Sequence, residues 1–124
     1  MAIVNQIDKK AKLNRWEIVQ YQIITHCYIN KISISEADLN CLTYLAIEGD
    51  QELSSFCQKA FSKNIFSSIQ SVRNSLRKME KKNLLIKEGK NKKKIFINPE
   101  MKVCSVGNIL LDFKFAYVAE TQKI

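Results

Sequence analysis

A basic stretch constrains this 124-residue chain more than any other feature. Between Lys59 and Lys94 the chain carries twelve Lys or Arg residues and two acids, Glu80 and Glu88, so the local charge is 12 − 2 = +10. The whole chain carries +8, which leaves 8 − 10 = −2 for everything else. Charge gathered in one stretch indicates a positive face, and a polyanion is the partner that such a face favours.

The basic stretch also has the apolar period of a helix. Four apolar residues recur in it at helical spacing: Ile69, Val72, Leu76 and Met79. They predict the buried stripe of a helix that begins near Phe66 or Ser67 and ends at about Lys82. The positive charges of this segment therefore belong to a folded element.

Beyond this helix the period changes. Two short apolar runs, at 84–88 and 94–98, flank a polar, lysine-rich loop that contains Gly89. Such runs around a glycine-containing loop predict a β-hairpin, and Pro99 is expected to end its second strand. The excess charge is thus divided between one helix and one hairpin loop.

Three segments upstream have helical features. Trp16–Ile29 has an apolar stripe and a length that favour a helix, although its β-branched residues leave a strand as the alternative. A helix over 36–48 is expected to end at Gly49. Asp50 is expected to cap a shorter helix that ends at 62–64. The residues expected to point inward from that shorter helix are Leu53, Phe56, Cys57, Ala60 and Phe61.

The end of the chain is predicted to form a C-terminal helix over 101–124. Its expected apolar stripe consists of Val106, Ile109, Leu110, Phe113, Ala116 and Tyr117. The chain then divides into an N-terminal extension at 1–33, expected to be helical, a central unit at 34–100 and this C-terminal helix. The two apolar extensions are candidates for a homodimer interface, and the alternative is that they cover the core of one subunit.

The order of these elements resembles the winged helix-turn-helix of bacterial and phage transcription regulators and of plasmid and phage replication initiators. The segment Met79–Leu85 is similar to the link between recognition helix and wing in those families, with Asn83 where glycine is commoner. The segment Ile95–Glu100 is similar to the wing exit of the initiators. The resemblance covers about 34–100. It implies a mainly α fold with a small β-hairpin, flanked by helical extensions, that binds specific double-stranded DNA sites in transcription or replication.

A helix fits the major groove of DNA, which is about 12 Å wide. The outer face of the predicted helix and the hairpin loop supply the expected DNA-binding residues: Ser67, Ser68, Gln70, Ser71, Arg73, Asn74, Arg77, Lys78, Lys90, Asn91, Lys92, Lys93 and Lys94. By residue type, Gln70 and Asn74 suit adenine and Arg73 suits guanine. Ser67 or Ser68 suits a phosphate at the helix N-terminus. The loop residues are expected to position the protein on the backbone of the DNA.

Two other interpretations of the basic face stay open. Lysine-rich outer faces also occur where a surface meets only solvent. Winged helices also hold protein partners, so the alternative function is a non-enzymatic structural or adaptor protein, such as a phage component. A structural protein of this kind would contact DNA without sequence preference.

An enzyme has little support in the sequence. The single histidine, His26, has no paired nucleophile, and there is no glycine-rich phosphate loop. We expect no metal and no cofactor, because the four cysteines are scattered and are expected to be small buried residues: Cys27, Cys41, Cys57 and Cys104. No apolar run approaches the roughly 20 residues that span a bilayer, so we expect a cytoplasmic protein without a membrane partner.

Overall fold

The computed structural model describes residues 2–11, 13–106 and 111–120. The helices within these ranges are α1 (Arg15–Ile29), α2 (Glu36–Glu48), α3 (Leu53–Ser62) and α4 (Ile69–Lys81). The strands are β1 (Ala2–Ala11), β2 (Gln51–Glu52), β3 (Leu85–Glu88), β4 (Lys94–Ile97) and β5 (Leu111–Glu120), and two short 3-10 turns are η1 (Lys90–Lys92) and η2 (Pro99–Met101). The expectation of a mainly helical chain with a small antiparallel sheet is confirmed.

The first two helices begin and end as their sequences dictate. α1 is the helix rather than the strand, and it starts with a capping box. In this box the Asn14 side chain accepts a hydrogen bond from Glu17 N at 2.8 Å, and Glu17 Oε1 accepts one from Asn14 N at 3.1 Å. α2 covers the predicted range 36–48 and ends at Gly49, whose φ of 81° favours glycine.

The cap of α3 differs from the prediction. Glu52 caps this helix, because its carboxylate accepts hydrogen bonds from Ser54 N at 3.0 Å and Ser55 N at 3.2 Å. Asp50, the predicted cap, instead forms an ion pair with Lys94 at 3.2 Å. The reason is the short strand β2, which carries the chain two residues past Asp50 before the helix begins.

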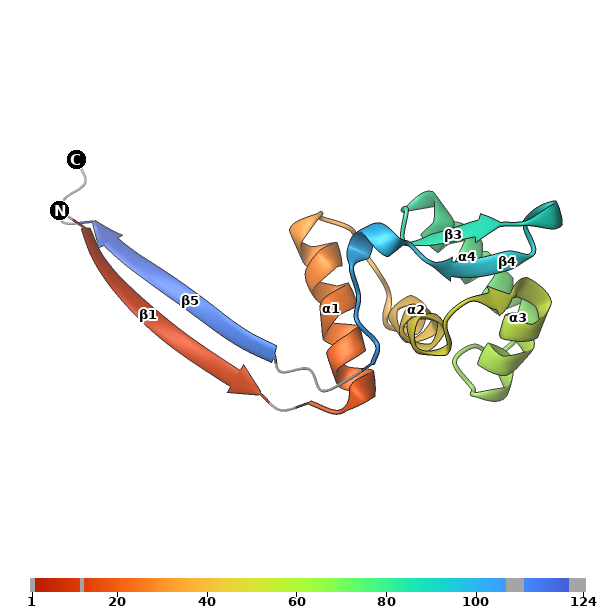
Figure 1. Cartoon of the computed structure of the whole chain (residues 1–124), viewed down its shortest axis with the longest axis horizontal. Coiled ribbons are helices and arrows are strands. Elements are labelled where there is room, and N and C mark those ends of the chain that lie inside the picture. Colours follow the sequence, from red (N-terminus) through yellow and green to blue (C-terminus); the bar gives the residue numbers. More distant parts are fainter. Residues whose placement is uncertain (1, 12, 107–110, 121–124) are drawn as a thin grey trace.

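The small sheet has the strand order β2–β4–β3 and is antiparallel throughout. β3 and β4 form the predicted hairpin, and β2 adds a third strand through the pair Gln51 and Ile95. β4 ends where the sequence indicates, because Asn98 caps the turn η2 and Pro99 occupies its first position. Figure 1 shows this sheet beside α4 and α3, with its loop at the end of the molecule opposite to β1 and β5.

The core lies between the four helices and the sheet. Its buried apolar residues are Ile18, Val19, Ile23, Cys27, Cys41, Leu42, Leu45, Ala46, Phe56, Cys57, Ala60, Val72, Leu76, Met79, Leu84, Leu85, Ile95 and Met101. Two residues expected in the core are exposed instead, Ile69 and Phe61. Ile69 is the first residue of α4 and Phe61 lies in the last turn of α3, so each sits where its helix leaves the core.

After the sheet the chain returns along α1. The Gln22 side chain holds this segment by two bonds to the Cys104 backbone, accepting from Cys104 N and donating to Cys104 O, both at 2.8 Å. Arg15 Nε donates to Ser105 O at 2.6 Å. Cys104 is exposed here, so the expectation of burial is wrong for this cysteine and confirmed for the other three. Burial raises the pKa of the Cys41 thiol to about 12, which keeps it protonated.

A second sheet joins the two ends of the described chain. β1 and β5 pair antiparallel over ten residues each, from Ala2 opposite Glu120 to Ala11 opposite Leu111. The resulting ribbon extends away from the helices (Figure 1). Among the helices that the structure describes, none has both the length and the apolar character needed to cross a membrane.

The predicted C-terminal helix over 101–124 is therefore wrong for the part that forms β5. The segment 111–115 alternates apolar and charged residues, which is the period of a strand, and it has a partner strand in β1. Ile109 and Leu110 of the expected stripe lie outside the described residues. The N-terminal extension at 1–33 likewise contains strand β1 before its helix.

Candidate nucleic-acid interface

The start of α4 uses serines that were expected to meet phosphate. Ser68 is the N-cap, and its Oγ accepts a hydrogen bond from Ser71 N at 3.0 Å. The two hydroxyl oxygens are also 2.9 Å apart. Ser67 is exposed but precedes the helix, which spans 69–81 rather than 67–82. Ser68 and Ser71 therefore hold the helix end in this chain, and Ser67 is the serine that is open to a ligand.

Three side chains of α4 form an exposed polar row. Gln70 Nε2 donates to Asn74 Oδ1 at 3.0 Å, and Arg77 Nη1 lies 3.5 Å from the same oxygen. The spacing of four and three residues places them one above the other on the helix. Gln70 and Asn74, both predicted to read adenine, thus form a hydrogen bond with each other. A base would have to replace this bond in order to contact either side chain.

Arg73 lies closer to α3 than the other predicted side chains. It is half-buried, and its Nη2 donates to Ser54 Oγ at 3.3 Å near the start of α3. A guanidinium held this way has donors left over, since it carries five N–H groups. Arg73 thus connects α4 to the first turn of α3, and its contact to guanine stays a prediction.

Lys78 belongs to a polar cluster that the sequence did not indicate. Its Nζ lies 2.7 Å from Asp38 Oδ2, and Ser75 Oγ donates to Asp38 Oδ1 at 2.6 Å. Asp38 is only 2% exposed. Burial by itself raises the pKa of Asp38, but the hydrogen bonds and charge of Lys78, together with the Ser75 and Ser35 hydroxyls, outweigh it and lower that pKa below its ordinary value.

This cluster joins α4 to α2. Because Lys78 is paired with Asp38, its charge is only partly available to a ligand. Only one local signal pointed to it, since Ser75 is a polar residue inside the buried arc of α4. The partner Asp38 is 37 residues away in the chain, and no short-range pattern connects the two. Asp38 also lies in the first turn of α2, where the helix dipole favours an acid.

The hairpin loop presents most of the remaining predicted residues. Lys90, Asn91, Lys92 and Lys93 are all exposed at its tip. Lys94 is exposed too, but it forms the ion pair with Asp50 and lies 5.9 Å from the centre of the Phe96 ring. Asn83, between α4 and β3, has a φ of 60°, the positive value that its resemblance to a glycine position implied.

The loop shape depends on Gly89, and we expect Gly89→Ala to lower the free energy of unfolding by about 1–3 kcal/mol. Gly89 has φ 89° and ψ −175°, a region that only glycine occupies readily. An added Cβ would meet Lys94 Cβ at an ordinary 3.6 Å, so the cost comes from the backbone and not from a clash. Urea denaturation tests this. Lys93→Ala, on a residue with helical φ and ψ, is the control and should change stability by less than about 0.5 kcal/mol.

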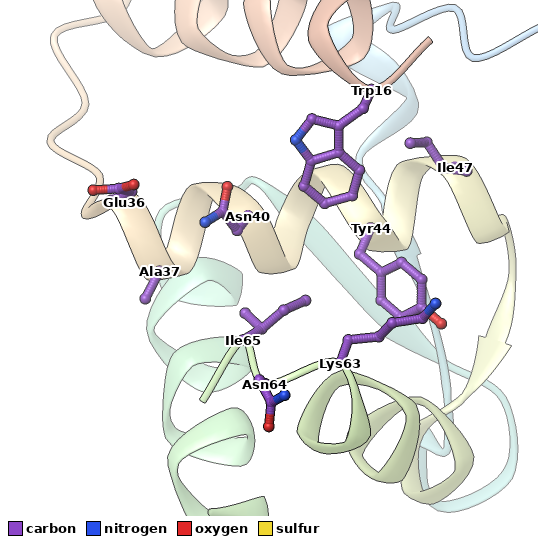
Figure 2. A pocket seen from close by; sticks show the side chains of 9 residues that line it. All are labelled: Trp16, Glu36, Ala37, Asn40, Tyr44, Ile47, Lys63, Asn64 and Ile65. Carbon is purple, nitrogen blue, oxygen red and sulfur yellow. The ribbon is translucent and has the colours of Figure 1, made fainter. Parts of the chain in front are cut away.

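A separate groove of about 800 Å³ lies along α2. Its lining residues are Trp16, Glu36, Ala37, Asn40, Tyr44, Ile47, Lys63, Asn64 and Ile65 (Figure 2). They come from the start of α1, from α2 and from the turn between α3 and α4. Trp16 and Tyr44 form one side, and Tyr44 packs on Phe56 with 5.6 Å between ring centres. No predicted DNA-binding residue lines this groove, which is mainly apolar with a few polar groups.

No protein family, no curated protein and no solved structure matches this chain. Within the described residues, no three His, Cys, Asp or Glu side chains are grouped so that they could hold a metal ion. The features of this chain that bear on its function are therefore the side chains of α4, the hairpin loop and the groove.

Proposed function

We propose that this chain is a winged helix-turn-helix protein that binds double-stranded DNA. In this proposal α4 enters the major groove and the β3–β4 loop, as the wing, lies against neighbouring phosphates. The element order α2–β2–α3–α4–β3–β4 and the strand order β2–β4–β3 support the fold assignment. The observation that carries the proposal is the exposed polar row of α4, followed after strand β3 by an exposed lysine loop.

The contacts within the chain suggest which residues bind bases, which bind phosphates and which hold α4 in place. Gln70, Asn74 and Arg77 are exposed and carry the donors and acceptors that read base edges. Lysines of the loop neutralise phosphates, which gives affinity without sequence preference. Arg73 and Lys78 act mainly by holding α4 against α3 and α2. The protein would act by occupying a promoter or a replication origin, where it blocks or recruits other machinery.

The test compares three single charge reversals that each change the net charge from +8 to 8 − 2 = +6. Arg77→Glu should weaken binding to a selected duplex by about tenfold or more, because it removes a base contact and repels phosphate. Lys92→Glu should weaken binding to all duplexes alike and reduce the salt slope by about 1. Lys102→Glu, on an exposed lysine after η2, is the matched control. Fluorescence anisotropy against salt, on selected and random duplexes, measures all three.

The control variant Lys102→Glu distinguishes binding through α4 and the loop from general attraction of a positively charged protein to DNA. Equal losses in all three variants would mean that only the overall charge matters. Unchanged affinity in Arg77→Glu and Lys92→Glu would show that α4 and the loop are not the interface, and the DNA-binding proposal would be wrong.

The groove on α2 favours a second candidate, a structural or adaptor protein that holds a protein partner. Its aromatic wall, formed by Trp16 and Tyr44, suits an apolar side chain of a partner. Salt-sensitive binding to all duplexes alike would support this structural role with nonspecific DNA contacts. A clear preference for one duplex would support the regulator or initiator instead.

A further inference from the structure

We propose that the outer face of α1 binds α1 of a second copy of this chain, in an antiparallel pair with a two-fold axis near Ile24. This face is separate from α4 and the hairpin loop. The inference does not depend on DNA binding, and its test measures assembly alone.

The outer face of α1 carries an apolar stripe. Tyr21, Ile24 and Tyr28 recur at helical spacing and are 40%, 37% and 83% exposed. On the opposite face of the same helix, Val19 and Ile23 are fully buried in the core. Single exposed apolar residues are ordinary, but a continuous stripe on one helix marks an interaction surface. α1 therefore has an inner apolar face that packs in the core and an outer apolar face that is exposed.

The absence of charge on this stripe identifies the kind of partner. Between Glu17 and Lys31 the chain has no Lys, Arg, Asp or Glu, although 26% of the whole chain is charged. The stripe therefore offers no cation to nucleic acid and no counter-charge to a basic or acidic protein surface. Interface cores are depleted in charge and enriched in tyrosine. The stripe suits another uncharged helical face of the same kind.

The two charges at its ends make the stripe complementary to itself. Glu17 and Lys31 lie equally far from Ile24 along the chain, since 24 − 17 = 7 and 31 − 24 = 7. In an antiparallel pair centred on Ile24, Glu17 in the first turn of α1 of one copy lies near the end of α1 of the other, and Lys31 follows that end by two residues with a φ of 56°. Tyr21 then lies within one residue of the level of Tyr28 in the second copy. A two-fold axis repeats each contact, so both ends of the pair match.

The residues that this pairing needs are accessible in the single chain. Glu17 and Lys31 are both exposed, and Glu17 uses one carboxylate oxygen for the cap of α1, which leaves the other available. The returning segment at 102–106 is held by Gln22 and Arg15 on another side of α1. It does not cover Tyr21, Ile24 or Tyr28, which are all exposed. A second copy can approach this face without displacing any described element.

Sedimentation equilibrium of the full chain tests the proposal. The unmodified chain should form dimers, and Tyr28→Glu should weaken the dimer by about tenfold or more, because it places a charge within the apolar stripe that the two copies share. Phe61→Glu, at an exposed apolar residue of α3, is the control and should leave the dimer unchanged. Since Tyr28 is largely exposed, the fold should persist in both variants, which thermal melting by circular dichroism checks.

Charge reversal tests the antiparallel register. Glu17→Lys and Lys31→Glu should each weaken the dimer by several-fold, because like charges then face each other twice. The double variant with both reversals should recover the affinity, since the pair is restored with opposite polarity. A loss of helix capping in Glu17→Lys would remain in the double variant, so recovery reports on the contact between copies. A monomer at every concentration, a dimer unaffected by Tyr28→Glu, or a double variant without recovery would overturn the proposal.

Discussion

Phe56→Ala is expected to lower the free energy of unfolding by about 3–5 kcal/mol, the usual cost of truncating a buried phenylalanine. Phe56 is completely buried in α3 and packs on Tyr44 of α2. Truncation leaves a cavity between two helices that small neighbouring residues cannot fill. Because small domains are stable by only about 5–15 kcal/mol, this loss would bring the chain close to unfolding. Urea denaturation followed by circular dichroism measures it.

Phe61→Ala on the same helix provides the matched control. Phe61 is 42% exposed, so its truncation should cost less than about 1 kcal/mol. The sequence predicted that both phenylalanines point inward, and the two variants therefore also test the burial that the structure assigns. Similar losses for both variants would mean that α3 is rotated relative to the described structure.

Asp38→Ala is expected to lower the free energy of unfolding by about 2–3 kcal/mol. The larger part comes from Ser75, whose buried hydroxyl would lose its acceptor at 2.6 Å. Lys78 contributes less, because its side chain is 52% exposed and solvent screens the ion pair. Asp38→Asn retains an acceptor oxygen for Ser75 and should cost about 1 kcal/mol. Equal losses for the two variants would assign the stabilisation to the charge rather than to the buried hydrogen bond.

The contribution of Asp38 should depend on pH in a direction that its pKa fixes. The folded state holds the pKa of this carboxyl below its ordinary value. Asp38 therefore stabilises the fold above the unfolded pKa of about 3.9, and the contribution is lost as pH falls through the lower, folded pKa. The difference between the unmodified chain and Asp38→Asn should be full near neutral pH and should shrink below about pH 4. Urea titrations across this range measure it, and a difference that grows towards acid would contradict the assignment.

Local signals allowed most of the central unit to be predicted. The range of α2, the hairpin and its end before Pro99 follow from stop residues and from the change of apolar period, which act over a few neighbours. The cap of α3 was wrongly assigned to Asp50, because a two-residue strand has too few residues to show a period. Helix boundaries read from composition alone shift in this way by a few residues.

The failures concern pairing over long distances. Phe113, Ala116 and Tyr117 fit a helical stripe, yet 111–120 forms a strand because β1 lies a hundred or more positions earlier and supplies a partner. Lys78 was assigned to DNA contact since its buried partner Asp38 is on another helix. Nothing in a local window distinguishes a charge that faces solvent from one whose counter-charge arrives through the fold. The helix and the loop of the candidate interface could thus be predicted, but not which of their cations are already engaged.

The hydrogen bonds between Gln22 and Cys104 close a loop of 82 residues with a single side chain. A contact so distant in the chain costs more entropy to form than the local contacts of the helices, and both of its bonds lie at the surface. The segment that they hold should therefore detach at a smaller free energy than the core needs to unfold. Detachment would release one leg of the β1–β5 ribbon while the other leg stays joined to α1. In mechanical terms, the side chains of Gln22 and Arg15 are two neighbouring anchors, and together they decide whether the ribbon is a fixed arm or a tether.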